Sequence, residues 1–259
     1  MKKVLLCIFG LLTISNTQAQ GRDIVYDEIS NIIVAESKPK IFTLAANYVF
    51  GTKQIQGIYT IDKHFFGFAT YNYNRTTIEY TPLLGSRITE ENNNNGYSFG
   101  GGYQNFGHVG KYKNLEVLTG FETQNAAVIS YFTSHKDSPD RGDEYLEEKY
   151  YKIFTQFNMM KCRTNFDSGF SLKLSYFKFL KNPTYNGATN FFITPSYSFN
   201  YKLLKSKSLL LTSQIGLSFA LHNFENSYQG DNFSFSQSDY VLGGILKFGI
   251  QYKFNFNKK

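Results

Sequence analysis

From Lys40 onward, apolar and polar residues alternate along the chain with a period of two. This is the period of a β-strand, in which successive side chains point to opposite faces of the sheet. The alternation predicts about ten strands, most of them near the length that a tilted membrane strand requires. The expected strands are 42–50, 54–61, 64–74, 97–104, 115–122, 151–159, 170–176, 193–199, 209–219 and 247–256.

The segments between the expected strands are alternately long and short from the third strand onward. The long ones are 75–95, 133–149 and 223–239, the shorter ones are 107–114, 163–169 and 202–208, and 181–189 is intermediate. An even number of antiparallel strands, with long loops at one end and short turns at the other, is the plan of an outer-membrane barrel. We therefore expect an all-β fold, an antiparallel up-and-down transmembrane β-barrel of about ten strands within a range of 8–12.

The beginning of the chain has the layout of a secretory signal peptide. Lys2 and Lys3 precede a short apolar run, and Thr17-Gln18-Ala19 provides the small residues of a cleavage site. We expect a signal peptide at 1–19, Sec-type export, a periplasmic N-terminal segment at 20–39 and the barrel at 40–259. Segment 20–39 could be a tail, a partial plug or a strap against a partner, and the sequence does not choose among them.

The closing strand has one apolar face and one polar face, which suits a wall between lipid and a polar lumen. One stretch of this strand resembles the C-terminal insertion signal of bacterial outer-membrane barrels, namely Lys247-Phe248-Gly249-Ile250-Gln251-Tyr252-Lys253-Phe254. The defined positions of that signal are occupied here by Lys247, Gly249, Tyr252 and Phe254. Five further residues follow, whereas the pattern usually ends the chain. The span from Lys40 also resembles small, mostly uncharacterised outer-membrane barrels of Gram-negative bacteria.

This resemblance implies an outer-membrane location and a set of partners. These are outer-membrane lipids and lipopolysaccharide, the barrel-assembly machinery during insertion, and a protein partner in the same membrane. The 26 Phe and 20 Tyr residues agree with a lipid-facing exterior. A net charge of +7 alone could suggest nucleic acid, but export and scattered lysines argue against that partner. The alternative fold is a secreted soluble β-sandwich or lipocalin-like barrel, which would turn its apolar face inward.

The polar faces of the expected strands predict what lies in the lumen. They carry six ionisable residues: Glu116, Glu122, Lys152, Lys173, Lys247 and Lys253. Opposite charges in a confined space are expected to pair. Open aqueous pores belong to barrels of about 16 strands, so a polar network that fills the lumen is the leading interpretation. A narrow conduit for an ion or small solute is the alternative.

Few other motifs indicate chemistry. None of His64, His108, His135 and His222 has the spacing of a metal site, and we expect no cofactor, no metal and no catalytic residue. Barrel enzymes acting on lipid A would need a His beside a Ser or Asp, for which His135 is the local candidate. The acidic stretch 135–149 reads as a solvated loop, and Asn92–Asn95 as a loop tip. Gly100-Gly101-Gly102 favours a bend in the wall.

Three functions therefore remain open, in a definite order. The first is a non-enzymatic outer-membrane barrel with a structural, accessory or surface-interaction role, because recognition in such proteins lies in long polar loops. The second is a narrow-pore channel or transporter for small solutes. The third is a lipid A-modifying barrel enzyme.

Overall fold

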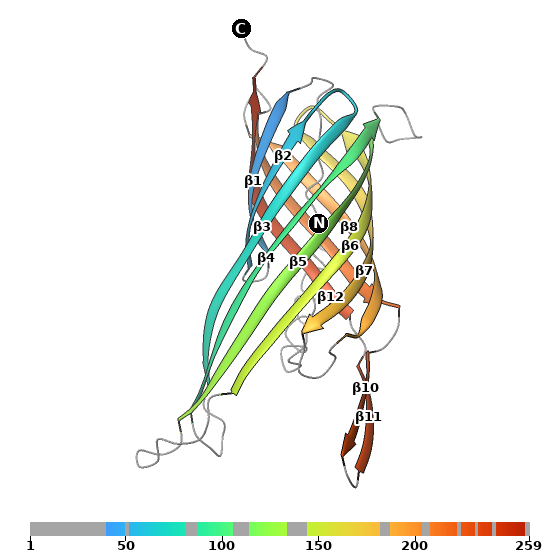
Figure 1. The fold of residues 1–259 in the computed structure, drawn as a ribbon. Helices are drawn as coiled ribbons and strands as arrows, with labels where there is room; N and C mark the ends of the chain where they lie inside the picture. Colours follow the sequence, from blue (N-terminus) through green and yellow to red (C-terminus); the bar gives the residue numbers. More distant parts are fainter. Residues whose placement is uncertain are drawn as a thin grey trace, which may run out of the picture.

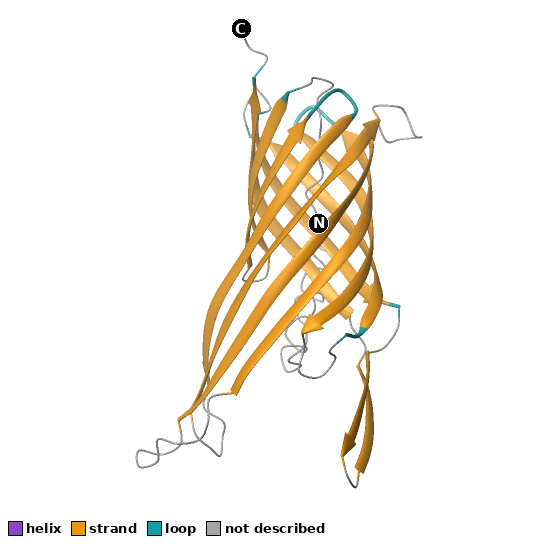
Figure 2. Cartoon of the chain, viewed as in Figure 1, coloured by secondary structure: helices purple, strands orange, loops and turns teal. Residues whose placement is uncertain are grey.

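The structure, a computed structural model, consists of strands joined by loops (Figure 2). It describes residues 40–49, 52–80, 87–105, 114–133, 144–181, 187–203, 208–221, 224–230, 233–239 and 242–256. Within these ranges no helix is long and apolar enough to cross a membrane. The strands are β1 Ile41–Val49, β2 Thr52–Thr60, β3 Phe65–Tyr80, β4 Arg87–Asn105, β5 Asn114–Thr133, β6 Glu144–Cys162, β7 Phe166–Lys181, β8 Thr189–Lys202, β9 Leu209–Ala220, β10 Phe224–Gly230, β11 Phe233–Asp239 and β12 Leu242–Asn255.

Ten of the described strands close into a single barrel, in the order β1-β12-β9-β8-β7-β6-β5-β4-β3-β2 (Figure 1). All neighbours are antiparallel, and each strand apart from β12 lies beside its predecessor in the chain. The last strand returns to the first, with pairs running from Ile41↔Asn255 to Val49↔Lys247. The predicted ten-stranded antiparallel up-and-down barrel is thus confirmed.

Apolar side chains cover the outside of the barrel, and polar ones line much of its inside. At least half of the side-chain surface is exposed in each of Tyr48, Ile55, Tyr71, Phe99 and Phe248. The residues beside them along each strand are buried and mostly polar: Asn47, Gln54, Asn72, Ser98 and Lys247. This is the reverse of a soluble barrel, whose apolar face points inward. The exterior therefore suits lipid, and the fold is that of a transmembrane β-barrel.

Four strands extend far beyond the rest, which corrects two expectations. β1 and β2 have 9 residues each, whereas β5 has 20. The segment 75–95, expected to be a long loop, instead belongs largely to paired β3 and β4. The four asparagines Asn92–Asn95, expected at a loop tip, lie within β4 and pair with β3 on one side and β5 on the other. A strand that pairs outside a bilayer needs no apolar face. The extended parts of β3 and β4 therefore lack the apolar–polar alternation from which strands were predicted.

The other end of the barrel carries short turns, among them 61–64 and 163–165. The end of β12 lies at this same end, as Figure 1 shows. In the first turn the backbone N–H groups of His64 and Phe65 donate to Asp62 Oδ1 at 2.6 and 2.8 Å. These two hydrogen bonds, the one from His64 first, lower the pKa of the Asp62 carboxyl below its ordinary 3.8.

A two-stranded hairpin of β10 and β11 stands apart from the barrel wall, at the same end as the long strands (Figure 1). The segment 223–239 was expected to be a long loop, and residues 224–239 instead contain this paired hairpin. The 134–143 part of the expected acidic loop lies outside the described residues, and residues 144–149 belong to β6.

Inside the barrel, aromatic side chains pack against glycines of the wall. Phe68, Gly100, Gly120 and Phe154 lie in one row across β3, β4, β5 and β6. The rings of Phe68 and Phe154 meet across the two glycines, with centroids 6.1 Å apart. A Cβ at Gly100 would lie 2.9 Å from Phe68 and 2.1 Å from the Thr119 carbonyl oxygen. The sequence favoured a bend at Gly100-Gly101-Gly102, and the structure shows that Gly100, like Gly120, makes room for aromatic rings.

Gly100→Ala should destabilise the barrel, because the new methyl group has no space on the lumen side. Overpacking of this kind typically costs about 1–3 kcal/mol. The urea midpoint of the barrel refolded in lipid vesicles measures the effect. Gly67→Ala is the matched control, since a Cβ there comes no nearer than 3.7 Å to the neighbouring strand. Equal midpoints for the two variants would contradict the role assigned to Gly100.

Asp62→Ala should destabilise the turn at neutral pH and much less in acid. Because the pKa of Asp62 is lower in the folded chain, the carboxylate stabilises the fold fully above the ordinary value of 3.8. That contribution disappears as the pH falls through the lowered pKa. Urea midpoints of the variant and the unchanged chain should therefore differ at pH 7 and converge in acid. A difference that does not change with pH would rule out this assignment.

Candidate functional site

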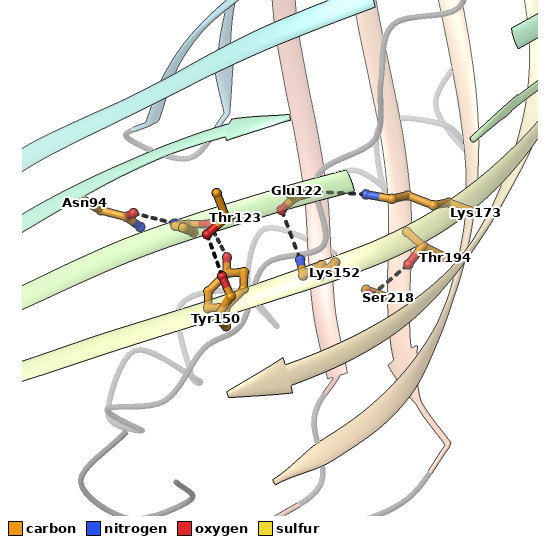
Figure 3. A network of polar contacts seen from close by, with 9 residues as sticks. Asn94, Glu122, Thr123, Tyr150, Lys152, Lys173, Thr194 and Ser218 are labelled. Atoms are coloured by element: carbon orange, nitrogen blue, oxygen red, sulfur yellow. Dashed lines mark hydrogen bonds and ion pairs between the residues drawn. The ribbon is translucent and has the colours of Figure 1, made fainter. Parts of the chain in front are cut away.

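The main candidate site is a group of three buried charges in the lumen, drawn in Figure 3. Glu122 of β5 lies directly opposite Lys152 of β6 in the strand register. Its Oε1 atom is 3.3 Å from Lys152 Nζ, and its Oε2 atom accepts a hydrogen bond from Lys173 Nζ of β7, also at 3.3 Å. One carboxylate thus joins three consecutive strands from the inside.

Aromatic rings complete the surroundings of the two lysines. Lys173 is opposite Gln156 in the register and reaches past Phe154 to Glu122, with its Nζ 4.3 Å from the Phe154 ring centroid. Lys152 Nζ lies 5.1 Å from the centroid of Tyr150. Both lysines are 0 % exposed. In so dry a setting the attraction between opposite charges is much stronger than in water.

A second carboxylate, Glu116, is held by neutral amides. Its Oε1 accepts a hydrogen bond from Asn114 Nδ2 at 2.9 Å, and its Oε2 accepts one from Asn158 Nδ2 at 3.1 Å. Gln156 Nε2 in turn donates to Asn158 Oδ1 at 2.8 Å. All four side chains are buried. Of these three bonds, the one from Asn158 to Glu116 joins β6 to β5, so this group also fastens neighbouring strands.

Hydrogen bonds toward the long-strand end continue the same pattern. Thr123 Oγ1 donates to the Tyr150 carbonyl oxygen at 3.0 Å. The Tyr150 hydroxyl donates to Gln124, whose Nε2 donates to Asn94. These contacts join β4, β5 and β6 (Figure 3).

Around Pro195 in β8, a side-chain contact takes the place of ladder pairs. The β8–β9 register has no pair at Thr194 or Pro195, as expected for a residue without a backbone donor. Thr194 and Ser218 instead share a hydrogen bond between hydroxyls at 2.9 Å (Figure 3).

The other two predicted lumen lysines lie on β12, away from Glu122. Lys247 is buried, opposite Gln214 of β9 and Val49 of β1. Lys253 is only half-buried, near the short-turn end, where its backbone N–H donates to the Ser208 carbonyl oxygen at 2.8 Å. The structure therefore brings Glu122, Lys152 and Lys173 together, and it places Lys247 and Lys253 on β12.

The residues of the expected insertion signal divide between the two faces of β12. Tyr252 and Phe254 are exposed, with ring centroids 4.7 Å apart. Gly249 lies between Asn47 of β1 and Thr212 of β9, and Thr212 Oγ1 donates to Asn47 Oδ1 at 3.5 Å across it. A Cβ at Gly249 would lie 2.1 Å from that amide oxygen. Gly249 thus has a structural use at the seam, and its role in insertion stays a prediction.

A buried ion pair near the short turns was not anticipated from the sequence. Lys202 Nζ of β8 lies 2.7 Å from Asp167 Oδ1 of β7, and it also donates to the Arg163 carbonyl oxygen at 2.5 Å. The Arg163 backbone N–H donates to the same Asp167 oxygen at 3.1 Å. Lys202 was expected at the start of the short connecting segment 202–208, whereas the structure places it at the end of β8. Asp167 stands two positions before Gly169, which faces inward, so the alternation of a strand would have predicted that the Asp167 side chain also points inward.

The lumen also contains more apolar volume than expected. One cluster comprises Tyr150, Phe177, Phe179 and Phe192, and the other comprises Ile58, Phe66, Phe68, Leu118 and Phe154. The polar network expected in the lumen therefore shares the interior with two apolar clusters. The alternating positions of these residues along their strands place them on the inward face. Each of them lies in a stretch so rich in Phe and Tyr, however, that the apolar residues facing outward hide the alternation in the sequence.

These side-chain contacts hold neighbouring strands of the wall together. Among the described residues they form no cluster of reactive side chains. There, no three His, Cys, Asp or Glu side chains come together as metal ligands. His64 stacks on Tyr103 with centroids 5.4 Å apart, and its Nδ1 is 3.1 Å from the Gln104 carbonyl oxygen. His108, His135 and His222 lie outside the described residues.

No known protein family and no curated protein matches the chain. Solved structures that resemble it include CarO2 of Acinetobacter baumannii, at 10% identity and a TM-score of 0.34, covering 83% of this chain and 99% of that one. The translocator domain of the autotransporter NalP from Neisseria meningitidis has 12% identity and a TM-score of 0.37, covering 97% and 96%. OmpT of Vibrio cholerae has 8% identity and a TM-score of 0.25, covering 86% and 100%. At such values the resemblance carries no functional argument.

Glu122→Gln should destabilise the barrel strongly, because it leaves two buried lysines without their shared carboxylate. Breaking a buried ion pair from one side typically costs about 3–5 kcal/mol. The urea midpoint in lipid vesicles provides the measurement. Glu147→Gln is the control, since its pair with Lys181 at 2.6 Å is largely exposed and should be worth less than about 1 kcal/mol. Similar losses for both variants would show that the Glu122 cluster does not brace the wall.

Proposed function

We propose that this chain is an integral protein of the outer membrane of a Gram-negative bacterium, reached after Sec-type export. Its role is non-enzymatic, and it acts as an accessory or surface-interaction protein through the end that carries the long strands. The observation that carries this proposal is the extension of β3–β6 beyond the closed barrel. The distribution of charge and aromatic residues in the lumen supports it.

The extension begins where the outer strands of the group lose their neighbours. On one side the pairs of β2 with β3 stop at Lys53↔Tyr73, although β3 continues to Tyr80. On the other side the pairs of β6 with β7 stop at Lys149↔Lys181, although β6 starts at Glu144. Among the described residues, the part beyond is a four-stranded sheet whose outer strands, β3 and β6, have no further paired strand, so both of its edges are open. Open edges carry unpaired backbone groups and are common sites of strand addition by a partner.

The two faces of the wall support the proposed location. A barrel with apolar residues outside and buried charges inside is stable only where lipid surrounds it. Bacterial outer membranes are where such barrels occur, with the short turns on the periplasmic side. The long strands and the β10–β11 hairpin would then face the outside of the cell, the side on which a surface-interaction protein meets its partner.

The lumen favours bracing over transport or catalysis. Part of the lumen is occupied by the side chains of Glu122, Lys152 and Lys173, and two aromatic clusters lie close by. No observation on the described residues favours a continuous polar conduit. The lipid A-modifying enzyme likewise has no described histidine beside a serine or an aspartate at the long-strand end. Both alternatives remain subordinate proposals.

The test is affinity purification from outer membranes in mild detergent, with a tag inserted after Gln20 so that the closing strand stays unaltered. Thr76→Pro and Thr77→Pro form a matched pair on β3. The backbone N–H groups of successive residues in a strand point to opposite sides. One of the two prolines therefore removes a hydrogen bond to β4, whereas the other, the edge variant, removes only an N–H group at the open edge. The edge variant should stay folded and should lose a partner that the unchanged chain retains in fixed proportion.

Two results would overturn the proposal. If the unchanged chain purifies alone, or keeps its partner in both proline variants, the open edge of β3 is not a binding surface. If the chain fractionates with soluble proteins, the membrane location itself is wrong.

A further inference from the structure

Basic side chains surround the end of the barrel that carries the short turns (Figure 1). Among the described residues of this end, five basic ones are exposed or half-buried, and they come from separate parts of the wall. They are Lys40 before β1, Lys63 in the β2–β3 turn, Lys161 at the end of β6, Arg163 in the β6–β7 turn and Lys253 near the end of β12. We call these five residues the basic rim.

Little negative charge offsets the basic rim. Asp62 is the only exposed carboxylate among the described residues of this end, and its Oδ1 atom already accepts two backbone hydrogen bonds. Asp167 is buried and pairs with Lys202, and Glu116 is buried in the lumen. The exposed surface at the short-turn end is therefore positively charged.

The opposite end of the barrel has the reverse balance of charge. By their positions in the strands, eight carboxylates lie toward that end: Glu79, Glu90, Glu91, Glu144, Glu147, Glu148, Glu225 and Asp239. Six basic residues lie there: Lys53, Arg75, Arg87, Lys149, Lys178 and Lys181. The positive surface thus belongs to the short-turn end and does not simply repeat the net charge of +7 of the whole chain.

The basic rim adjoins aromatic residues of the lipid-facing surface. Phe65 stands two positions after Lys63, Phe254 directly follows Lys253, and both aromatic side chains are exposed. Tyr201, near the end of β8, is exposed as well. Aromatic residues are enriched where the apolar part of a membrane barrel meets the lipid headgroups. The basic rim therefore lies at the depth of the headgroups, where phosphate groups are within reach of its side chains.

Arg163 is the member of the basic rim whose position is best fixed. Its backbone N–H donates to the Phe166 carbonyl oxygen at 3.0 Å and to Asp167 Oδ1 at 3.1 Å. Its carbonyl oxygen accepts a hydrogen bond from Lys202 Nζ at 2.5 Å. Its guanidinium carbon lies 4.8 Å from the centroid of the Phe166 ring, and the residue stays exposed. The planar N–H donors of a guanidinium held in this way match the oxygens of a phosphate group.

We propose that the basic rim binds the phosphate-bearing headgroups of anionic phospholipids in the membrane leaflet at the short-turn end. Basic residues spread over several turns fit a surface of headgroups better than one compact anion, for which they would converge in a single pocket. Each Lys or Arg beside an anionic lipid surface adds to the attraction. This inference needs only a barrel that lies in lipid, and it goes beyond the proposed role of the open β3 edge.

Lipid association in vesicles tests the proposal. The full chain is refolded into phosphatidylcholine vesicles that contain a trace of spin-labelled phosphatidylglycerol or, in parallel, of spin-labelled phosphatidylcholine. Electron spin resonance gives the fraction of each labelled lipid whose motion the protein restricts. The ratio of the two fractions is the preference of the protein for the anionic headgroup.

Two triple variants, matched in net charge, locate that preference on the molecule. The rim variant combines Lys63→Gln, Lys161→Gln and Arg163→Gln. The control variant removes three basic residues toward the opposite end, namely Lys53→Gln, Lys149→Gln and Lys178→Gln. All six side chains are exposed or half-buried, so both variants should fold, and the gel mobility of unheated samples verifies this.

The unchanged chain should restrict phosphatidylglycerol more than phosphatidylcholine. In the rim variant this preference should fall by about fivefold or more, since one basic residue beside an anionic surface has roughly that effect. The control variant should keep most of the preference. Inorganic phosphate should weaken the preference no more than chloride at equal ionic strength, because single ions do not replace a surface of headgroups.

Three results would overturn the proposal. The unchanged chain could restrict the two lipids equally, or the rim and control variants could lose the preference equally. Removal of the preference by inorganic phosphate but not by chloride would indicate a site for single ions instead of a lipid surface. None of these results bears on whether a partner is lost in the β3 edge variant, so the two proposals fail separately.

Discussion

Hydrogen bonding between β1 and β12 is the interaction on which the rest of the structure depends. In a bilayer no water is present to satisfy backbone groups, so a sheet with a free edge would leave a row of them unpaired. The nine pairs from Ile41↔Asn255 to Val49↔Lys247 remove that edge. Gly249 keeps the seam tight, because it leaves room for the Asn47 side chain to contact Thr212 across β12.

Closure also creates the electrostatic problem that the lumen residues solve. Ionisable side chains directed inward are cut off from bulk water, and each isolated charge would be costly. Glu122 meets two lysines from the next two strands, and Glu116 accepts hydrogen bonds from the amides of Asn114 and Asn158. The aromatic rings beside these groups exclude water and strengthen each contact. The polar and aromatic parts of the lumen thus form one bracing system on the β4–β7 side of the wall.

The alternation of residues was enough to predict the class of fold and the direction of most side chains. In β12 the apolar Phe248, Ile250, Tyr252 and Phe254 are exposed and the polar Lys247 and Gln251 are buried, as its two expected faces require. It failed at Asn92–Asn95, because strands outside the lipid need no apolar face and a polar run then looks like a loop. It also missed Phe66 and Phe68 as lumen residues, since their neighbours Phe65 and Tyr71 are apolar too. The meeting of Glu122 with Lys173 depends on strand register, which a single sequence does not specify.

The unequal strand lengths separate two tasks within one sheet. β1 and β2 are only long enough to close the wall, whereas β5 and its neighbours continue past it by many residues. Pairing beyond the lipid adds nothing to closure and exposes two edges that proteins usually protect. In the function proposed above, these edges serve contact with another molecule and not the stability of the barrel. The braced lumen then holds rigid the base from which that sheet projects.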